Sequence, residues 1–528
     1  MSDRGIIQQI DKLIDIGIAL SNERDKEILL EKILLSAKAI TGADGGSLYR
    51  IEGSDICAAI IHSDGLKIHL GGCSGMPVKM AKVPLYLDNG AINLSHVVSY
   101  AYHSQRAVNI PDVYDPNDDF DFSGPREFDQ TYHYRTKSLL TIPLKNHKDD
   151  VIGVLQLINA MDSETGQVIE FDDISQKMTT AMASQAAIVL TQQQLIGDLE
   201  KLFQSLVKLV ATAIDQKSPY TGAHSRRVPV ITMMLAEAVH EIDHGCFKDF
   251  CLSDADRYEL EIASWLHDCG KITTPEFVMD KSTKLETIFD RIELIETRFE
   301  IVKRDLEIEK LKRQVAAIEN GVALDEEVER HFQRQIAQLE DDLAFIRRVN
   351  IGAEFMSEQD QARIKALSSQ VCRFGQQDRP LLSDDEAYNL SISRGTLTQE
   401  ERQVINHHIV ATIEMLKTID FPKHLKNVPE FAGGHHERMD GKGYPNGLRR
   451  EQMSVQARIM GIADIFEALM DSDRPYKKGK RLSEALSILK NMKENGHIDP
   501  DLYDVFMEKK VYKAYADNYV PAEQIDVD

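Results

Sequence analysis

The chain has 528 residues, more than one hydrophobic core usually serves, so we expect two or three domains. A formal net charge of −23 argues against binding to DNA or RNA, and any site for an anionic substrate would need local positive charge. No apolar run is long enough to cross a bilayer, and acidic residues interrupt the apolar N-terminus, which excludes a secretory signal. The six cysteines form no C-x-x-C pair. We therefore expect a cytoplasmic protein without membrane contact.

The first part of the chain mixes helix and strand signals. Residues 1–24 repeat isoleucine and leucine at helical spacing and predict an N-terminal helix, and 24–40 predict a second helix. Apolar, β-branched runs predict strands at 46–51, 56–62, 138–144 and 151–159, the last two joined as a hairpin. Residues 25–195 are thus expected to form an α+β domain with an antiparallel sheet flanked by helices.

A long helix is predicted next. From Asp172 to Asp215 there is little glycine and no proline, and apolar residues recur at helical spacing. One helix could join the halves of the chain, with 196–213 as the linker, and could pair with its copy in a homodimer. The alternative is two ordinary helices broken near Gly197.

The remaining residues, 214–528, have an almost entirely helical pattern. Between about 283 and 349, apolar residues fall at spacings of three and four on both sides of an Asn320–Gly321 turn, which predicts an antiparallel helical hairpin. From about 350 to 396 the pattern weakens, and we expect loops. The segment 283–396 could serve as a lid, a partner-docking arm or a dimer contact.

The strongest local signal for chemistry is the sequence His267-Asp268-Cys269-Gly270-Lys271, which follows a helical run. Imidazole and carboxylate together suit a first-row transition metal, and a carboxylate can bridge two metals. Lys271 would reach the same site if the helix continued beyond His267. A lone His-Asp pair is weak evidence, because such pairs are common on protein surfaces.

Further histidines and carboxylates strengthen this signal. His224 stands where a helix is expected to begin, and His408 lies within another predicted helix. The adjacent pair His435-His436 precedes two acidic residues and a glycine-rich turn, and Asp464 follows in a helical segment. Each histidine alone would more often be a surface or core residue. Together, five histidines and two aspartates among helices predict a metal centre.

The segments HDCGK (267–271) and HHERMDGKGYP (435–445) resemble the motifs of the HD-GYP family, a branch of the HD-domain phosphohydrolases. The resemblance covers about 210–282 and 397–515. It implies an all-helical domain around a bi- or trinuclear metal centre that hydrolyses cyclic di-GMP to the linear dinucleotide pGpG or to GMP. The metal ligands that it implies are His224, His267, Asp268, His408, His435, His436 and Asp464, with Asp268 as the bridge.

The resemblance also implies the metal count and the substrate contacts. Members with three metals carry a glutamate four residues before the first ligand histidine; that position is Tyr220 here, so we expect two metals, iron or manganese. Lys271 would act beside the scissile phosphate. The remaining substrate contacts would be Gly443, Tyr444 and Pro445 at the guanine base, and Arg474 and Lys477 at the phosphates. Cys269 replaces an aliphatic residue, and we expect a small buried side chain, with a redox-sensitive thiol as the alternative.

The segments RAVNIPDVYD and SLLTIPLKNHKDDVIGVLQLINA resemble a GAF domain over about 25–195. This implies a sensory or dimerisation module. GAF domains that bind cyclic nucleotides often carry Asn-Lys, then Phe, then Asp-Glu; this chain has Asn159-Ala160, Phe171 and Asp172-Asp173. The lysine and the Asp-Glu pair are missing, so a small-molecule ligand and a purely structural role both remain open.

The expected molecule is thus an α+β multidomain protein: a GAF α/β/α sandwich, a long linker helix and an all-α HD-GYP domain with an inserted helical hairpin. The first hypothesis for its function is a cyclic di-GMP phosphodiesterase regulated by the GAF domain. Hydrolysis of 3′,3′-cyclic GMP-AMP is an alternative, because the sequence does not fix the choice of base. A catalytically silent scaffold that responds to cyclic dinucleotides is the second class.

Overall fold

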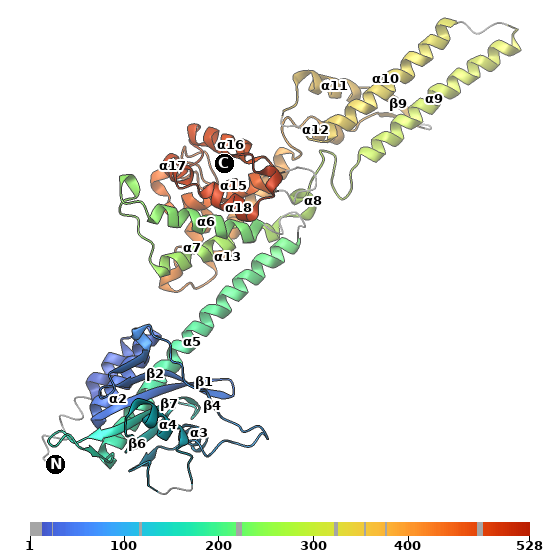
Figure 1. The fold of residues 1–528 in the computed structure, drawn as a ribbon. Helices are drawn as coiled ribbons and strands as arrows, with labels where there is room; N and C mark the ends of the chain where they lie inside the picture. Colours follow the sequence, from blue (N-terminus) through green and yellow to red (C-terminus); the bar gives the residue numbers. More distant parts are fainter. Residues whose placement is uncertain are drawn as a thin grey trace. The chain divides into compact units, whose positions relative to one another are not determined.

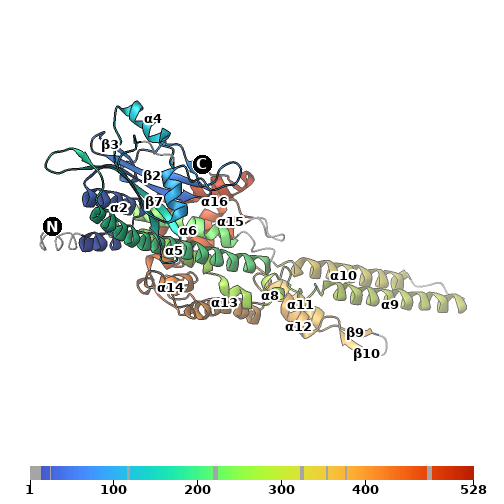
Figure 2. The same cartoon turned by 90° about the horizontal axis from the view of Figure 1, so that it is seen from below.

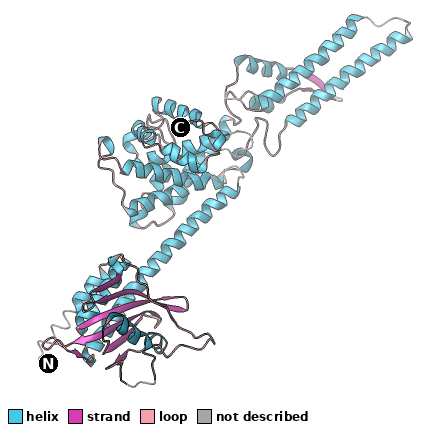
Figure 3. Ribbon diagram, viewed as in Figure 1, coloured by secondary structure: helices cyan, strands magenta, loops and turns pink. Residues whose placement is uncertain are grey.

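The computed structural model describes residues 13–23, 25–115, 119–217, 224–321, 326–352, 355–374, 377–471 and 479–527. The chain divides into two compact units, 1–202 and 203–528. Most strands belong to the first unit, while the second is almost entirely helical (Figure 3). Of the predicted N-terminal helix, residues 13–21 are helical and 1–12 lie outside the described residues.

The first unit is built on one antiparallel sheet with the strand order β3-β2-β1-β7-β6-β5 (Figure 1). In addition, β4 pairs with β2, and β8 pairs with β7. The strands are β1 (Ala43–Glu52), β2 (Asp55–Ser63), β3 (Ile68–Gly71), β4 (Val83–Pro84), β5 (Val108–Ile110), β6 (Leu139–Lys145), β7 (Val151–Met161) and β8 (Val168–Ile169). All four predicted strands are present, and the predicted hairpin is the β6–β7 pair.

Helices cover both faces of this sheet, which confirms the predicted α/β/α sandwich. On one face, α2 (Lys26–Thr41) and the first turns of α5 (Asp173–Lys217) bury aliphatic side chains against β1, β6 and β7. On the other face lies α3 (Val97–Ser104), which shares a core with β1, β2 and β7. A short helix, α4 (Ser123–Tyr132), precedes β6. Because both faces are covered, β6 is buried almost throughout rather than at alternate residues.

The three residues that remain of the nucleotide-binding pattern have structural contacts in this unit. Asn159 takes a left-handed φ of 56°, and its side chain donates hydrogen bonds to the hydroxyl of Tyr134 and the carbonyl oxygen of Arg135. Phe171 is buried in the core below the sheet. Asp172 accepts hydrogen bonds from backbone N–H groups at the start of α5.

Helix α5 is a single helix of 45 residues, so the alternative of two helices broken near Gly197 is wrong. The predicted domain boundaries at 195 and 213 both fall inside it and stay predictions. No helix in the described part of the chain combines the length and the apolar character needed to cross a membrane.

The second unit is a helical domain around one large hydrophobic core. Its main helices are α6 (His224–His240), α7 (Asp254–Leu266), α13 (Gln399–Lys417), α14 (Val428–Gly433), α15 (Val455–Met470), α16 (Leu482–Glu494), α17 (Pro500–Glu508) and α18 (Val511–Tyr519). Capping boxes fix the start of two of them: Ser253 caps α7, and Thr398 caps α13. A short α8 (Glu276–Met279) leads to the inserted segment.

The inserted segment forms the predicted helical hairpin and more. Helices α9 (Ile292–Glu319) and α10 (Glu326–Asn350) lie side by side in both views (Figures 1 and 2). The expectation of loops from 350 to 396 is wrong, because this stretch contains α11 (Glu358–Ser368), β9 (Val371–Phe374), β10 (Gln377–Pro380) and α12 (Asp384–Leu390). Helices α11 and α12, with Cys372 of β9, share a hydrophobic core with α9 and α10.

Two buried lysines fix the base of the inserted segment. The Nζ atom of Lys281 lies 2.8 Å from both carboxylate oxygens of Glu401, in the first turn of the helix that carries His408. Lys284 is 1% exposed and donates to the carbonyl oxygen of Leu390. Burial lowers the pKa of Lys284 to about 8. Lys281 also donates to the side chain of Asn389, so it links the insertion to helix α13.

Candidate metal centre

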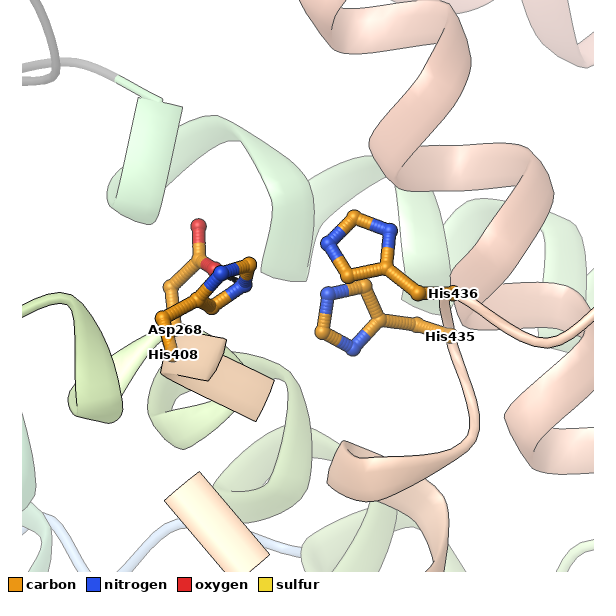
Figure 4. Close-up of side chains that lie close together, drawn as sticks. All are labelled: Asp268, His408, His435 and His436. Atoms are coloured by element: carbon orange, nitrogen blue, oxygen red, sulfur yellow. Dashed lines mark ion pairs between the residues drawn. The ribbon is translucent and has the colours of Figure 1, made fainter. Parts of the chain in front are cut away.

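Separate elements of the second unit bring the predicted ligands together. His224 is the first residue of α6, and His267 directly follows the end of α7. His408 lies in α13, and His435 follows α14. Figure 4 shows Asp268, His408, His435 and His436 close to one another. The seven residues that the resemblance implied as metal ligands all lie at this one place.

Two groups of side chains are arranged as metal ligands. The first ligand set consists of His224, His267, Asp268 and Asp464, and the second ligand set consists of Asp268, His408, His435 and His436. Within each set, one ligand atom from every residue lies within 4.8 Å of all the others. Asp268 belongs to both sets, as a bridging carboxylate would.

The two carboxylate oxygens of Asp268 face different sets. Its Oδ2 lies 3.2 Å from Nε2 of His267 and 3.5 Å from Nε2 of His224. Its Oδ1 lies 3.2 Å from Nε2 of His408. Asp464 completes the first set with its Oδ1 atom 3.1 Å from Nε2 of His224. This division of the two oxygens suits a carboxylate shared between two cations.

Backbone carbonyls orient three of the imidazole rings. In each case Nδ1 meets the carbonyl oxygen of the residue three positions earlier. The distances are 2.7 Å for His267 to Ser264, 2.5 Å for His408 to Ile405 and 2.6 Å for His435 to Ala432. Because a carbonyl oxygen only accepts hydrogen bonds, Nδ1 must carry the hydrogen, and Nε2 keeps its lone pair. The lone pairs are therefore available to a metal.

The inward atoms lack partners. The Nε2 atoms of His267, His408 and His435 and the Oδ1 atom of Asp268 are buried, and none has a hydrogen-bond partner among the described residues. Each such buried group costs about 1–3 kcal/mol if it stays unsatisfied. Nε2 of His408 and Oδ1 of Asp268, which both offer a lone pair, lie only 3.2 Å apart. Cations between these atoms would satisfy all of them, so the residues present fit a metal centre.

The electrostatic environment keeps most of these side chains in the protonation state that can bind a metal. Burial raises the pKa of Asp268, but the ammonium group of Lys271, together with contacts to the neighbouring imidazoles, outweighs burial and holds that pKa well below its usual range. Burial lowers the pKa of His436 to about 4, and burial together with the neighbouring imidazoles lowers the pKa of His435 far below its usual value. His224 is the exception, because hydrogen bonds to carboxylates raise its pKa despite burial.

The segment after His267 departs from the expected helix. Helix α7 ends at Leu266, and Cys269–Thr273 form a 3₁₀ turn, so the expectation that an α-helix continues through Lys271 is wrong. Lys271 nevertheless reaches the site, with Nζ 2.5 Å from Oδ2 of Asp268. Cys269 is 3% exposed, and burial raises the pKa of its thiol to about 11, which favours the expected buried side chain over a reactive thiolate.

Gly270 allows this turn to touch the helix that carries His408. Its N–H donates to Oγ1 of Thr412 at 2.9 Å. A Cβ atom at position 270 would overlap the carbonyl oxygen of His408 and the backbone nitrogen of Thr412. Only glycine permits this approach, which brings Asp268 next to His408.

The turn that contains Gly443, Tyr444 and Pro445 borders the site. The ring of Tyr444 stacks on that of His436, with centroids 4.9 Å apart and planes at 25°. A Cβ atom at Gly443 would overlap the backbone of Glu437, so the glycine is needed for the turn to fold back on the chain.

Two carboxylates that the sequence reasoning did not assign support the site. Glu467 is 1% exposed, and its Oε2 contacts Nδ1 of His224. Glu437 is buried and accepts a hydrogen bond from the N–H of Asn446 at 2.7 Å, which holds the turn after Tyr444. The spacing of Glu467, three residues after the predicted ligand Asp464, would have placed both on one helix face.

Three residues named from the sequence cannot be located. Arg474 and Lys477, predicted at the substrate phosphates, lie outside the described residues, and so does Tyr220. The neighbouring Lys480 pairs with Glu484.

The first unit contains a cavity of about 330 Å³. Strands β1, β2 and β7 line it with hydroxyl, imidazole and amide groups, among them Ser47, Tyr49, His62 and Gln156. The hydroxyl of Tyr49 donates to Oε1 of Gln156 at 3.2 Å inside this lining. The cavity is large enough for a small organic molecule.

Comparison with known proteins agrees with this division. Residues 25–190 match the GAF domain family, and residues 383–502 match the HD domain family. A 3′3′-cGAMP-specific phosphodiesterase of Vibrio cholerae is 25% identical over 349 residues, which cover 66% of this chain and 45% of that protein. A cyclic di-GMP phosphodiesterase of Pseudomonas aeruginosa is 39% identical over 115 residues, 22% of this chain and 26% of that protein.

The GAF domain of an Acinetobacter phosphoenolpyruvate-protein phosphotransferase aligns with 37% of this chain and 98% of its own, at 14% identity and a TM-score of 0.26. The chain spans less than half the length of the two curated relatives. The HD match contains His408, His435, His436 and Asp464, while the other ligands precede the insertion. The chain therefore carries a GAF domain and, after it, an HD domain, the pair that the resemblance to GAF-linked HD-GYP proteins implied.

Proposed function

We propose that the second unit hydrolyses the phosphodiester bond of a cyclic dinucleotide, with cyclic di-GMP as the substrate and pGpG or GMP as the product. The observation that carries this proposal is the pair of ligand sets that share Asp268. Two cations a few ångströms apart are a recurring device for phosphodiester cleavage. The names of both curated relatives support a cyclic dinucleotide as the substrate class.

We infer that each ligand set holds one cation. Imidazole nitrogens and carboxylate oxygens in each set suit iron or manganese. When bound, such a pair of cations supplies a nucleophile from water near neutral pH and offsets negative charge on the phosphoryl group. Asp268 keeps the two sets in register, because each of its oxygens faces a different set.

The remaining residues of the site would bind and orient the substrate. Lys271 is partly exposed beside Asp268, so its ammonium group can offset charge that builds on the scissile phosphate. The ring of Tyr444, fixed by stacking on His436, offers an aromatic face to a base. Arg474 and Lys477 would supply the positive charge that an acidic chain needs for an anionic substrate.

We further propose that the GAF domain regulates hydrolysis through α5, with a small molecule in its cavity as the signal. The last turn of α5 contacts two segments that carry residues of the first ligand set. One is the start of α6, with His224, and the other is the 3₁₀ turn that follows His267 and Asp268. Nζ of Lys217 lies 2.5 Å from the carbonyl oxygen of Ile272, next to the 3₁₀ turn's Lys271. The buried Asp215 accepts a hydrogen bond of 2.6 Å from Ser225, the residue after the first ligand histidine. A shift of this helix end would therefore displace ligand-bearing backbone.

A homodimer through α5 completes the proposal. Apart from Ile196, six of its large apolar side chains are between 50% and 63% exposed: Ile188, Leu195, Leu199, Leu202, Leu206 and Leu209. From residue 195 onward their spacings alternate between four and three, which is the pattern of a helix that pairs with another helix. The same helix of a second copy would cover them.

The test is a hydrolysis assay. Protein purified without oxygen and loaded with Mn²⁺ or Fe²⁺ should convert cyclic di-GMP to pGpG or GMP, as measured by liquid chromatography. His267→Ala and Asp268→Asn should abolish turnover, while the control Glu237→Gln, which weakens a partly exposed ion pair of α6 with Arg257, should not. Retained turnover in both site variants would refute the metal assignment. Bound metal without turnover would instead indicate the scaffold.

A second candidate substrate is 3′,3′-cyclic GMP-AMP, which the printed name of the Vibrio cholerae relative favours. Rates with the two dinucleotides at equal concentration decide between them. A higher kcat/KM for the mixed dinucleotide would replace cyclic di-GMP as the proposed substrate and leave the metal assignment intact.

A further inference from the structure

Two helices that carry ligands of the first set, α6 and α15, meet through side chains spaced one helical turn apart. His224 and Arg227 are three residues apart on α6, and Asp464 and Glu467 are three residues apart on α15. Side chains at this spacing share a helix face, so each helix presents one metal ligand and one charged neighbour. The ligands meet with Nε2 of His224 3.1 Å from Oδ1 of Asp464. The charged neighbours Arg227 and Glu467 form a second contact between the same helices.

The two carboxylate oxygens of Glu467 have different partners on α6. Its Oε2 contacts Nδ1 of His224, and its Oε1 accepts a hydrogen bond of 3.3 Å from Nη1 of Arg227. Rotation about the last bond of a glutamate side chain is soft, because that torsion lacks sharp staggered minima. A partner on Oε2 alone would leave the carboxylate free to turn. Arg227 on the other oxygen restrains this rotation and holds Glu467 in the orientation that meets His224.

Arg227 is held in its turn by the end of α15. The same Nη1 atom donates to Oδ1 of Asp471 at 3.4 Å, and Asp471 directly follows the last residue of α15. Glu467 and Asp471 are 1% and 5% exposed, so both carboxylates need a positive charge close by. The guanidinium of Arg227, whose side chain is 19% exposed, supplies that charge. One nitrogen atom of Arg227 thus ties α6 to two points of α15.

We propose that Arg227 is a positioning residue of the first ligand set: it locks Glu467, and through Glu467 the imidazole of His224, in the orientation that binds a cation. The inference rests on the metal pair of the proposed function and extends it to a residue outside both ligand sets. Asp464 is affected as well, because the same contacts keep α6 next to α15. The second ligand set has no member on α6 or α15, so Arg227 should not influence it.

A titration with Mn²⁺ tests the proposal without any substrate. In the full chain, freed of metal by a chelator, the electron paramagnetic resonance signal of unbound Mn²⁺ reports how many ions each chain binds and how tightly. Arg227→Met should weaken one of two ions by about 10-fold, as outer partners of a ligand do, and leave the other unchanged. The matched control is Arg226→Met, which removes the same charge from the neighbouring, exposed position of α6. Identical titrations of Arg227→Met and Arg226→Met would overturn the proposal.

A double variant shows whether Arg227 acts through Glu467. Arg227→Met in the Glu467→Gln background should weaken Mn²⁺ binding no further than Glu467→Gln alone, because the carboxylate that Arg227 holds is already gone. Losses that multiply would show that the two residues act independently and would contradict the proposal. The comparison stands even where Arg227→Met alone fails to fold, because the double variant leaves less buried charge without a partner.

The conservative variant Arg227→Lys provides a rescue. Since one nitrogen atom makes both contacts of Arg227, an ammonium group can replace it in part, and Arg227→Lys should bind Mn²⁺ more tightly than Arg227→Met. Equal weakening in both variants, with unchanged helical circular dichroism, would sink the positioning role. With cyclic di-GMP, excess Mn²⁺ should restore the kcat of Arg227→Met with little change in KM. If the unchanged chain shows no turnover, the proposed hydrolase fails, and the Mn²⁺ titration alone decides the role of Arg227.

Discussion

Four ligand histidines are oriented by a hydrogen bond at Nδ1, the ring nitrogen that faces away from the site. His267, His408 and His435 follow a helical turn, so a carbonyl three residues earlier is available to accept from Nδ1. His224 begins α6 and has no preceding turn of that helix, and the carboxylate of Glu467 takes the place of the carbonyl. A histidine that begins a helix thus depends on a side chain from another helix for its orientation.

Replacing Glu467 should weaken the first ligand set. In Glu467→Gln, the amide no longer offers a negatively charged acceptor to Nδ1 of His224, so the ring loses both its orientation and part of its basicity. Outer partners of this kind typically contribute about 10- to 100-fold in metal affinity or activity. We expect metal content after dialysis, measured by mass spectrometry, to fall for Glu467→Gln and not for the surface variant Glu237→Gln. Equal metal retention would show that Glu467 does not position the ligand.

Two glycines provide a matched pair of substitutions. Gly270→Ala should separate the 3₁₀ turn from α13, because the new methyl group would overlap backbone atoms of His408 and Thr412. We expect loss of metal from the site and a lower midpoint of thermal unfolding. Gly197→Ala meets no atom within 4 Å and lies in a helix, where alanine is favoured over glycine by about 1 kcal/mol. A destabilised Gly197→Ala or an unaffected Gly270→Ala would contradict this reading of the packing.

At the scale of elements, the end of α5 matters most, because its last turn touches the backbone on which ligands are mounted. Lys217 donates to the carbonyl oxygens of Ile272 and Thr274, and Asp215 accepts from Ser225. These bonds link the end of α5 to two segments of the second unit.

Removing Lys217 should loosen the 3₁₀ turn. In Lys217→Ala, the carbonyl oxygens of Ile272 and Thr274 lose their donor, so the amides from 269 to 275 should exchange hydrogen faster. Hydrogen-exchange mass spectrometry measures this locally, and kcat should fall several-fold while KM changes little, because no substrate-binding group is removed. Lys177→Ala, an exposed lysine near the start of α5, is the control. Unchanged exchange and unchanged kcat would argue against a role of α5 in regulation.

At the scale of the whole molecule, the proposed homodimer depends on the exposed leucines of α5. The double variant Leu199→Glu and Leu206→Glu should shift the protein from dimer to monomer, because each leucine contributes about 2 kcal/mol when it is buried. Sedimentation velocity over a range of concentrations measures the shift. Gln194→Glu, which adds one negative charge on α5 away from these leucines, should stay dimeric. A variant that sediments as the unchanged chain does would exclude α5 as the interface.

The sequence by itself determined the residue types of the site and most local elements. Alternation and helical spacing are local properties, so strands β1, β2, β6 and β7, the long α5 and the α9–α10 hairpin were all predictable, while the short strands β3, β4, β5 and β8 were not predicted. The short helices α11 and α12 were missed because they are too short to show a clear period. The capping box of Ser383 and Glu386 was a usable signal for α12.

Only the tertiary structure decided how these pieces make a site. The two oxygens of Asp268 face different histidine groups because Gly270 lets one turn lie against α13. Glu467 meets His224 across hundreds of residues of sequence. Contacts between distant segments depend on how helices pack, and packing leaves no periodic trace in the local sequence.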